Sequence, residues 1–241
     1  MRTQPRAWPA LVSALVLLAG CAQPTKKQSF DRERAMAVKT VVVAQRPNQD
    51  SYPVRLQRYP GQDLGLVASL IEDADERSQS DRLTKAVDPA ETRLQERFSA
   101  KLQQKLAAAG YATRLVVLPR IPSKDDELLA QVKAKGMGGD AVLAIGMFGA
   151  YAAAGRLTAY QPKISVSIRV VDTSAGALLY QEDLEYCFTL ARSDAAMLPC
   201  DPRYRFENFD ALVADPAKAR EGLITGLDAL AARVAADLKR N

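Results

Sequence analysis

The stretch KISVSIRVVDTSAGALLYQEDLEYCF, residues 163–188, decides the fold because its apolar residues alternate with polar ones. Such alternation is typical of a strand with one buried and one solvated face. Residues 173–176 predict a hairpin turn, so a return strand should run from residue 177 to about 188. One face of the return strand should carry Leu178, Tyr180, Leu184, Tyr186 and Phe188.

Strands and helices alternate in the chain before this hairpin. Short β-branched and apolar runs predict strands at residues 39–44, 111–118 and 141–146. Helices are expected over residues 64–71, 89–109 and 123–136, with the acidic segment 72–81 as a solvated surface. Asp88, Pro89 and Glu91 together form a helix-start signal with a capping box.

The segment after the hairpin predicts one more amphipathic helix. Asp215 and Pro216 repeat the helix-start signal, and Gly222 and Gly226 have a spacing that permits close approach of another backbone. The apolar stripe of this helix contains Leu223, Leu227, Leu230, Val234 and Leu238. The element order predicts an α/β fold, a mixed α+β sandwich: a mixed sheet with an antiparallel C-terminal hairpin and helices packed on it, forming a single domain over residues 38–241.

The composition of the chain excludes several kinds of chemistry. The 241 residues include no histidine, so HExxH zinc sites and histidine-activated nucleophiles are ruled out. The glycine-rich segment 136–141 loosely fits a dinucleotide fingerprint, but a helix is expected before it and a strand after it, the reverse of what that motif requires. Removal of residues 1–20 lowers the formal net charge from +5 to +3, and the interspersed charges argue against nucleic-acid binding. We therefore expect no metal, no cofactor, no nucleic-acid partner and no enzymatic activity.

The N-terminal segment reads as a targeting signal. Arg2 and Arg6 precede an apolar run that ends in LAGC at Cys21, which resembles the lipobox of bacterial lipoprotein precursors. The resemblance implies a signal peptide over residues 1–20, acyl chains such as palmitate on Cys21, and a polar tether over residues 21–37. Ala22 and Gln23 resemble the outer-membrane sorting pattern, so the domain should face the periplasm. The alternative is an ordinary cleaved signal followed by a chance cysteine.

Two cysteines remain if Cys21 is acylated. In an exported protein, Cys187 and Cys200 favour a disulfide, with free buried thiols or a metal site as the alternatives.

Two aromatic segments are candidates for contact with a partner, because aromatic residues and arginine are enriched at interface hot spots. The first, residues 148–161, is expected to be a Gly/Ala-rich connection, and the second spans residues 202–209. The alternative is that both fold onto the core. The candidate partner-binding residues are Phe148, Tyr151, Arg156, Tyr160, Tyr204, Arg205, Phe206 and Phe209.

Three segments together resemble a family of envelope proteins. These are residues 139–146, residues 160–162 and residues 169–180, which contain GDAVLAIG, YQP and RVVDTSAGALLY. They are similar to the anticodon-binding-domain-like periplasmic domains of the curli-secretion lipoprotein, of lipoprotein activators of penicillin-binding proteins and of the Tol-system propeller protein. The resemblance covers about residues 38–190 and transfers no functional residue.

The resemblance implies a non-enzymatic domain that docks onto other envelope proteins. We therefore expect an outer-membrane lipoprotein that acts as a binding or assembly factor in envelope maintenance, transport or secretion, with oligomerisation possible. One alternative is a ligand-binding or carboxylate-dependent enzymatic domain, and another is a structural subunit of a secretion assembly. A pore is not expected, because residues 148–160 lack paired segments of about 9–11 alternating residues.

Overall fold

The computed structural model describes residues 27–57, 65–155, 157–187 and 194–239. The strands are β1 (Thr40–Gln45), β2 (Val54–Leu56), β3 (Ala112–Val117), β4 (Ala141–Ala153), β5 (Gln161–Asp172), β6 (Leu178–Tyr186) and β7 (Ala196–Leu198). The helices are α1 (Arg32–Ala35), α2 (Gly65–Val87), α3 (Pro89–Thr92), α4 (Leu94–Ala108), α5 (Asp125–Ala134), α6 (Phe209–Ala214) and α7 (Pro216–Asp237), with a 3₁₀ turn over Pro202–Tyr204.

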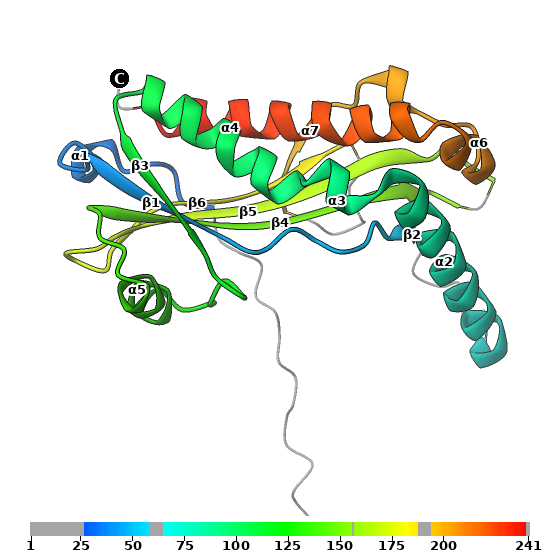
Figure 1. Ribbon diagram of the computed structural model, residues 1–241, viewed down its shortest axis with the longest axis horizontal. Helices are drawn as coiled ribbons and strands as arrows, with labels where there is room; N and C mark the ends of the chain where they lie inside the picture. The colour runs from blue at the N-terminus through cyan, green and yellow to red at the C-terminus, as the bar shows by residue number, and fades with distance from the viewer. Residues whose placement is uncertain (1–26, 58–64, 156, 188–193, 240–241) are drawn as a thin grey trace, which may run out of the picture.

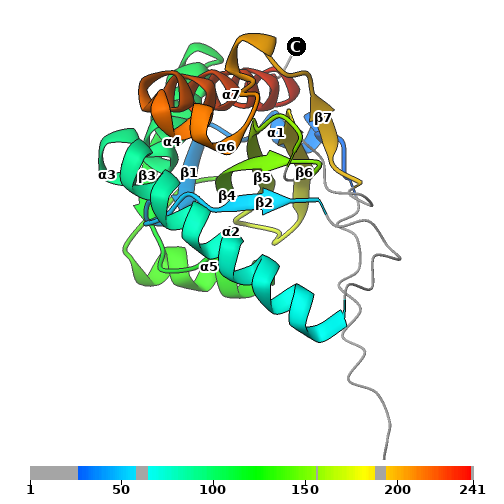
Figure 2. The same cartoon turned by 90° about the vertical axis from the view of Figure 1, so that its right-hand side faces the viewer.

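The seven strands form one mixed sheet in the order β3-β1-β4-β5-β6-β7. Strands β3, β1 and β4 are parallel, whereas β4, β5 and β6 are antiparallel neighbours. Strand β2 pairs with the last residues of β4, where β1 has already ended. Helices α4, α6 and α7 cover one face of the sheet and α5 covers part of the other (Figures 1 and 2). The expected α/β class with an antiparallel hairpin is confirmed.

The hairpin has the buried face that the alternation predicts. Ile164, Val166, Ile168 and Val170 of β5 belong to the larger core cluster, which also includes the α7 stripe. On the opposite face, Lys163 is buried rather than solvated, because its ammonium pairs with Glu185 across the hairpin at 3.1 Å.

The return strand follows the prediction with one exception. Tyr180, Leu184 and Tyr186 are buried in the larger cluster, but Leu178 packs against the smaller cluster beneath α5. A register shift in the β5–β6 pairing between Val170 and Val171 accounts for this change of face. The last predicted member, Phe188, lies outside the described residues.

The helix expected over residues 89–109 is interrupted at Arg93. Arg93 has a left-handed backbone (φ 46°), which ends α3 and starts α4 in a new direction. Asn48 then caps α4 from a distant loop, because its Oδ1 accepts from the Glu96 amide at 3.1 Å. A residue so distant in sequence supplies no local signal. The expected capping box is absent too, since Glu91 pairs with Arg220 at 2.8 Å.

Two element lengths differ from the prediction. The helix expected over residues 64–71 continues to Val87 as α2 and includes the acidic segment, whose described residues, 73–81, are exposed or half-buried as a solvated surface should be. Residues 148–153 are not a connection but the second half of β4, which pairs with β5 as far as Ala152. Small residues there let α4 lie close to β4. At Gly149, for example, a Cβ atom would lie 2.7 Å from the Leu94 side chain of α4.

Candidate functional site

The tyrosines of the first aromatic segment belong to the core. Tyr151 and Tyr160 are both 0% exposed, and Phe148 is half-buried on β4. The Tyr151 hydroxyl donates to the Ala219 carbonyl of α7 at 2.8 Å. Burial raises the pKa of Tyr151 well above its ordinary value. Arg156, the remaining candidate of this segment, lies outside the described residues.

The second segment packs onto the first. Tyr204, Phe206 and Phe209 are buried, and only Arg205 among these candidates is exposed. The Phe206 ring meets Tyr151 edge-on at a centroid distance of 5.8 Å, and Phe209 meets Tyr160 at the same distance. A pair of backbone hydrogen bonds between Tyr160 and Phe206 joins the two segments. The prediction that these aromatic side chains are available to a partner is therefore wrong.

The glycine spacing on α7 was the sequence signal for this packing. A Cβ atom at Gly222 would lie 2.8 Å from the Tyr204 Cβ, and one at Gly226 would lie 2.6 Å from the Tyr186 Cε1. The bare helix surface thus lets the aromatic rings approach the α7 backbone. In this chain, the GxxxG spacing on α7 therefore marks where aromatic rings pack closely against the helix backbone.

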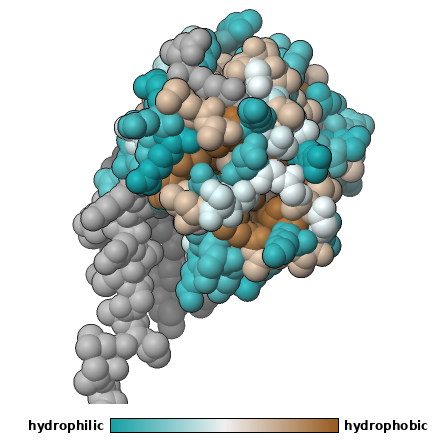
Figure 3. All heavy atoms as spheres, turned by 90° about the vertical axis from the view of Figure 1, so that its left-hand side faces the viewer, coloured by the Kyte–Doolittle hydropathy of each residue, from teal (hydrophilic) through white to brown (hydrophobic). Residues whose placement is uncertain are grey.

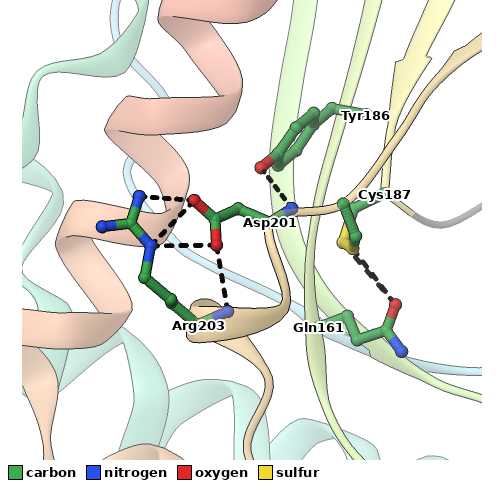
Figure 4. Close-up of a disulfide and its surroundings, with 6 residues drawn as sticks. Gln161, Tyr186, Cys187, Asp201 and Arg203 are labelled. Atoms are coloured by element: carbon green, nitrogen blue, oxygen red, sulfur yellow. Dashed lines mark hydrogen bonds and ion pairs between the residues drawn. A yellow bond between two sulfur atoms is a disulfide. The ribbon is translucent and has the colours of Figure 1, made fainter.

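Cys187 and Cys200 are joined in a disulfide that holds the segment containing β7 against β6 (Figure 4). Their Cα atoms are 4.2 Å apart. Cys187 has a left-handed backbone (φ 74°), and it packs against the larger cluster. The Tyr186 hydroxyl accepts from the Asp201 amide at 3.1 Å, which fixes the chain just after the bridge. This arrangement is structural.

The predicted tether is partly folded. Residues 27–38 form a segment, here called the strap, that lies along the outer edge of β6. Gln28 exchanges two backbone hydrogen bonds with Gln181, and the Asp31 amide donates to the Leu179 carbonyl at 2.9 Å. The Phe30 ring packs edge-on against Tyr180 at 6.4 Å. Residues 27–37, which were assigned to the tether, are therefore part of the folded structure.

A cluster of charged groups fastens the start of the strap. The Lys27 ammonium lies 2.6 Å from Glu182 Oε1, and Glu182 is only 2% exposed. Arg233 of α7 pairs with both Glu182 and Asp237, and the Tyr180 hydroxyl donates to each of these two carboxylates. Burial opposes ionisation of Glu182, but hydrogen bonds from Lys27 and Tyr180 and the Arg233 charge bring its pKa below the ordinary value. Sequence reasoning missed this cluster because Lys27 and Glu182 are 155 residues apart.

The partly covered face of the sheet contains a groove of about 250 Å³ with a mixed polar and apolar lining, next to the chain that leads into α5. Ser167, Arg169, Gln181 and Asp183 contribute its polar side chains. The Arg169 guanidinium donates to the carbonyls of Pro122 and Ser123, so it holds the α5 approach in place. This groove can accept a small hydrogen-bonding group, and it has no paired carboxylates suited to acid–base catalysis.

In the described part of the chain, no group of three or more His, Cys, Asp or Glu side chains is placed to hold a metal ion. None of the helices in that part is long and apolar enough to cross a membrane.

Comparison with known proteins establishes no family. No family model and no curated protein matches the chain. Similar solved structures include the PelC dodecamer from Paraburkholderia phytofirmans, which is 14% identical, with 89% of this chain and 96% of that chain covered and a TM-score of 0.33. The LpoB C-terminal domain from Salmonella enterica (9% identity, 64% and 89% coverage, TM-score 0.20) and lipoprotein GNA1162 from Neisseria meningitidis (16%, 61% and 81%, 0.20) are also similar. Likeness this low identifies neither the family of this chain nor its role.

Proposed function

We propose that the protein is an outer-membrane lipoprotein whose periplasmic domain acts as a non-enzymatic binding or assembly factor in the cell envelope. The proposal rests first on the lipobox-like LAGC that ends at Cys21. A disulfide between Cys187 and Cys200 agrees with an oxidising compartment.

A binding role is supported by what the polar groups of the domain do. The buried carboxylate of Glu182 is neutralised by Lys27 and Arg233, and buried Glu185 is paired with Lys163. Carboxylates that are ion-paired between strands and helices are poor candidates for catalysis. The chain has no histidine to take that role.

A second candidate function is the binding of a small polar ligand. The single observation that favours it is the groove beside Arg169. Substituting Asp183→Asn and Ser167→Ala, which are opposite each other in the β5–β6 register, would change the hydrogen-bonding character of the groove and leave Arg169 and its cross-strand partner Gln181 in place. A change in phenotype of these two variants, with acylation and stability unaltered, would favour the ligand over the docking role.

Acylation is tested by the intact mass of the mature protein together with membrane fractionation. We expect the mass of a chain that begins at Cys21 with lipid attached, and we expect Cys21→Ala to accumulate as an unacylated precursor. The matched control is Cys187→Ser with Cys200→Ser, which removes the other two cysteines and should leave acylation intact. A soluble wild-type protein with the mass of an unmodified polypeptide would refute the lipoprotein proposal.

The binding role is tested by crosslinking in cells followed by identification of the trapped proteins. A specific envelope protein should be captured by the wild type and lost from the Cys21→Ala variant. If instead one exposed carboxylate proves essential for function in a stable, correctly localised variant, catalysis would replace binding as the better explanation.

A further inference from the structure

The strap limits how far the domain can move from a lipid anchor. Cys21 precedes Lys27 by six residues, and six residues span at most about 20 Å when fully extended. Lys27 is fastened to the buried Glu182 carboxylate on β6. If Cys21 is acylated as proposed above, the edge of β6 must stay within about 20 Å of the membrane surface.

The register of the hairpin shows which end of the domain lies nearer to the anchor. Glu182 is opposite Ile168. From Ile168, β5 reaches Asp172 after four residues, about 13 Å, but reaches Gln161 only after seven, about 23 Å. The strap itself runs toward the nearer end and leads into α1 (Figure 1). We call this the α1 end, and the opposite end, at the β4–β5 connection, the far end.

The α1 end exposes apolar side chains. Met36, which caps α1, is 68% exposed. A groove of about 370 Å³ also opens there, between α5 and the first residues of β1 and β4. Leu129 and Met137 line it as half-buried side chains, whereas Val42, Val132 and Val142 are buried in the smaller core cluster. Figure 3 views the molecule from this side and shows apolar patches set among hydrophilic side chains.

Basic side chains lie beside these apolar features, together with Glu33, which is exposed on α1, and Asp31, which pairs with Arg34 at 3.5 Å. Arg32 and Arg34 are exposed on α1, and Lys133 borders the groove under α5. A second groove, of about 760 Å³ and lined mainly by alanines, lies between the last turns of α4 and α7 and is flanked by Lys105 and Lys239. Apolar side chains ringed by lysine and arginine are typical of surfaces that lie in a membrane interface.

We propose that the α1 end of the domain rests on the membrane surface, with Met36 at headgroup level and the surrounding basic side chains on anionic lipid phosphates. This inference rests on the proposed acylation of Cys21, which supplies the short connection. Each lysine or arginine near an anionic surface favours the bound orientation by about fivefold. The far end, including Leu157 with 99% exposure, then points away from the membrane and toward periplasmic partners.

A fluorescent label at one of two positions tests this orientation in the acylated, full-length protein. Acylation occupies the Cys21 thiol and the disulfide occupies the other two cysteines, so Met36→Cys and Leu157→Cys each introduce a single reactive thiol. The labelled proteins are reconstituted into vesicles of phosphatidylethanolamine and phosphatidylglycerol that contain a headgroup-linked quencher. We expect strong quenching at position 36, weak quenching at position 157, and a smaller difference at high salt.

Charge variants give the test a matched control. At the α1 end, Arg32→Gln with Lys239→Gln should lower the ratio of molecules whose α1 end contacts the membrane to molecules whose α1 end does not by about fivefold per side chain at low salt. At the far end, Arg55→Gln with Arg205→Gln should leave the quenching at position 36 unchanged, because both side chains are exposed away from the proposed contact.

The possible outcomes separate this proposal from the one on which it rests. Equal quenching at positions 36 and 157 in acylated protein would refute the proposed membrane orientation of the domain but not the lipoprotein proposal. Protein that has the mass of an unmodified chain and stays off the vesicles would overturn both.

Discussion

Replacing Tyr151 with alanine should destabilise the domain severely, because the side chain lies in the core where two segments meet α7. Tyr151 is 0% exposed, its ring packs edge-on against Phe206, and its hydroxyl donates to the Ala219 carbonyl at 2.8 Å. Truncating a buried aromatic side chain to alanine costs about 3–5 kcal/mol of unfolding free energy. For a domain of about 200 residues this corresponds to a fall in Tm of about 6–20 °C.

Tyr151→Phe separates the two contributions. This variant keeps the ring and loses only the hydrogen bond to Ala219, a loss of about 1 kcal/mol or about 2–4 °C in Tm. The assay is thermal and urea unfolding followed by circular dichroism, with the disulfide intact. Leu157→Ala is the control, because a fully exposed side chain should change stability by less than about 0.5 kcal/mol. A Tyr151→Ala variant as stable as this control would refute the placement of Tyr151 in the core.

Three further outcomes are expected. Gly226→Ala should cost about 1–3 kcal/mol in urea unfolding, because the added methyl group collides with the Tyr186 ring; an unchanged midpoint would contradict the close packing. Hydrogen bonds from backbone amides hold the pKa of Asp140 below its usual value, so the stability that this carboxylate contributes is present at neutral pH and is lost as the pH falls below about 4. In Asp140→Asn, the free energy of unfolding should therefore fall less steeply between neutral and acidic pH. A pH dependence unchanged from wild type would argue against these hydrogen bonds. Cys187→Ser with Cys200→Ser should lower stability by about 3 kcal/mol and abolish the effect of reductant on Tm, whereas a reductant effect that persists in this variant would show that the bridge is not its source.

The predictions that were confirmed depend on local pattern. Alternation in β5 and the apolar stripe of α7 place their buried residues correctly, because period two and period 3.6 each determine which side chains share a face. Asp215 and Pro216 start α7 as expected, with the Asp215 carboxylate accepting from the Lys218 amide at 3.0 Å. Each of these features is decided within a few residues of chain.

The predictions that were wrong concern contacts between distant segments. The Gly and Ala residues around Tyr151 are compatible with either a loop or a strand, and only the pairing with β5 makes this segment a strand. The aromatic rings at Tyr160 and Phe206 become core only because the two segments exchange backbone hydrogen bonds and α7 presents glycines to them.

By itself, the sequence determined the hairpin, the helix starts, the pair of cysteines available for a bridge and the absence of histidine. Only the tertiary structure decided that the aromatic candidates are core and that the supposed tether folds from Lys27 onward. The physical reason is that burial and charge pairing depend on which segments meet in space. Lys27 has no local sign of a partner, and it becomes a fixed point because folding brings the buried Glu182 carboxylate to the same edge of the sheet.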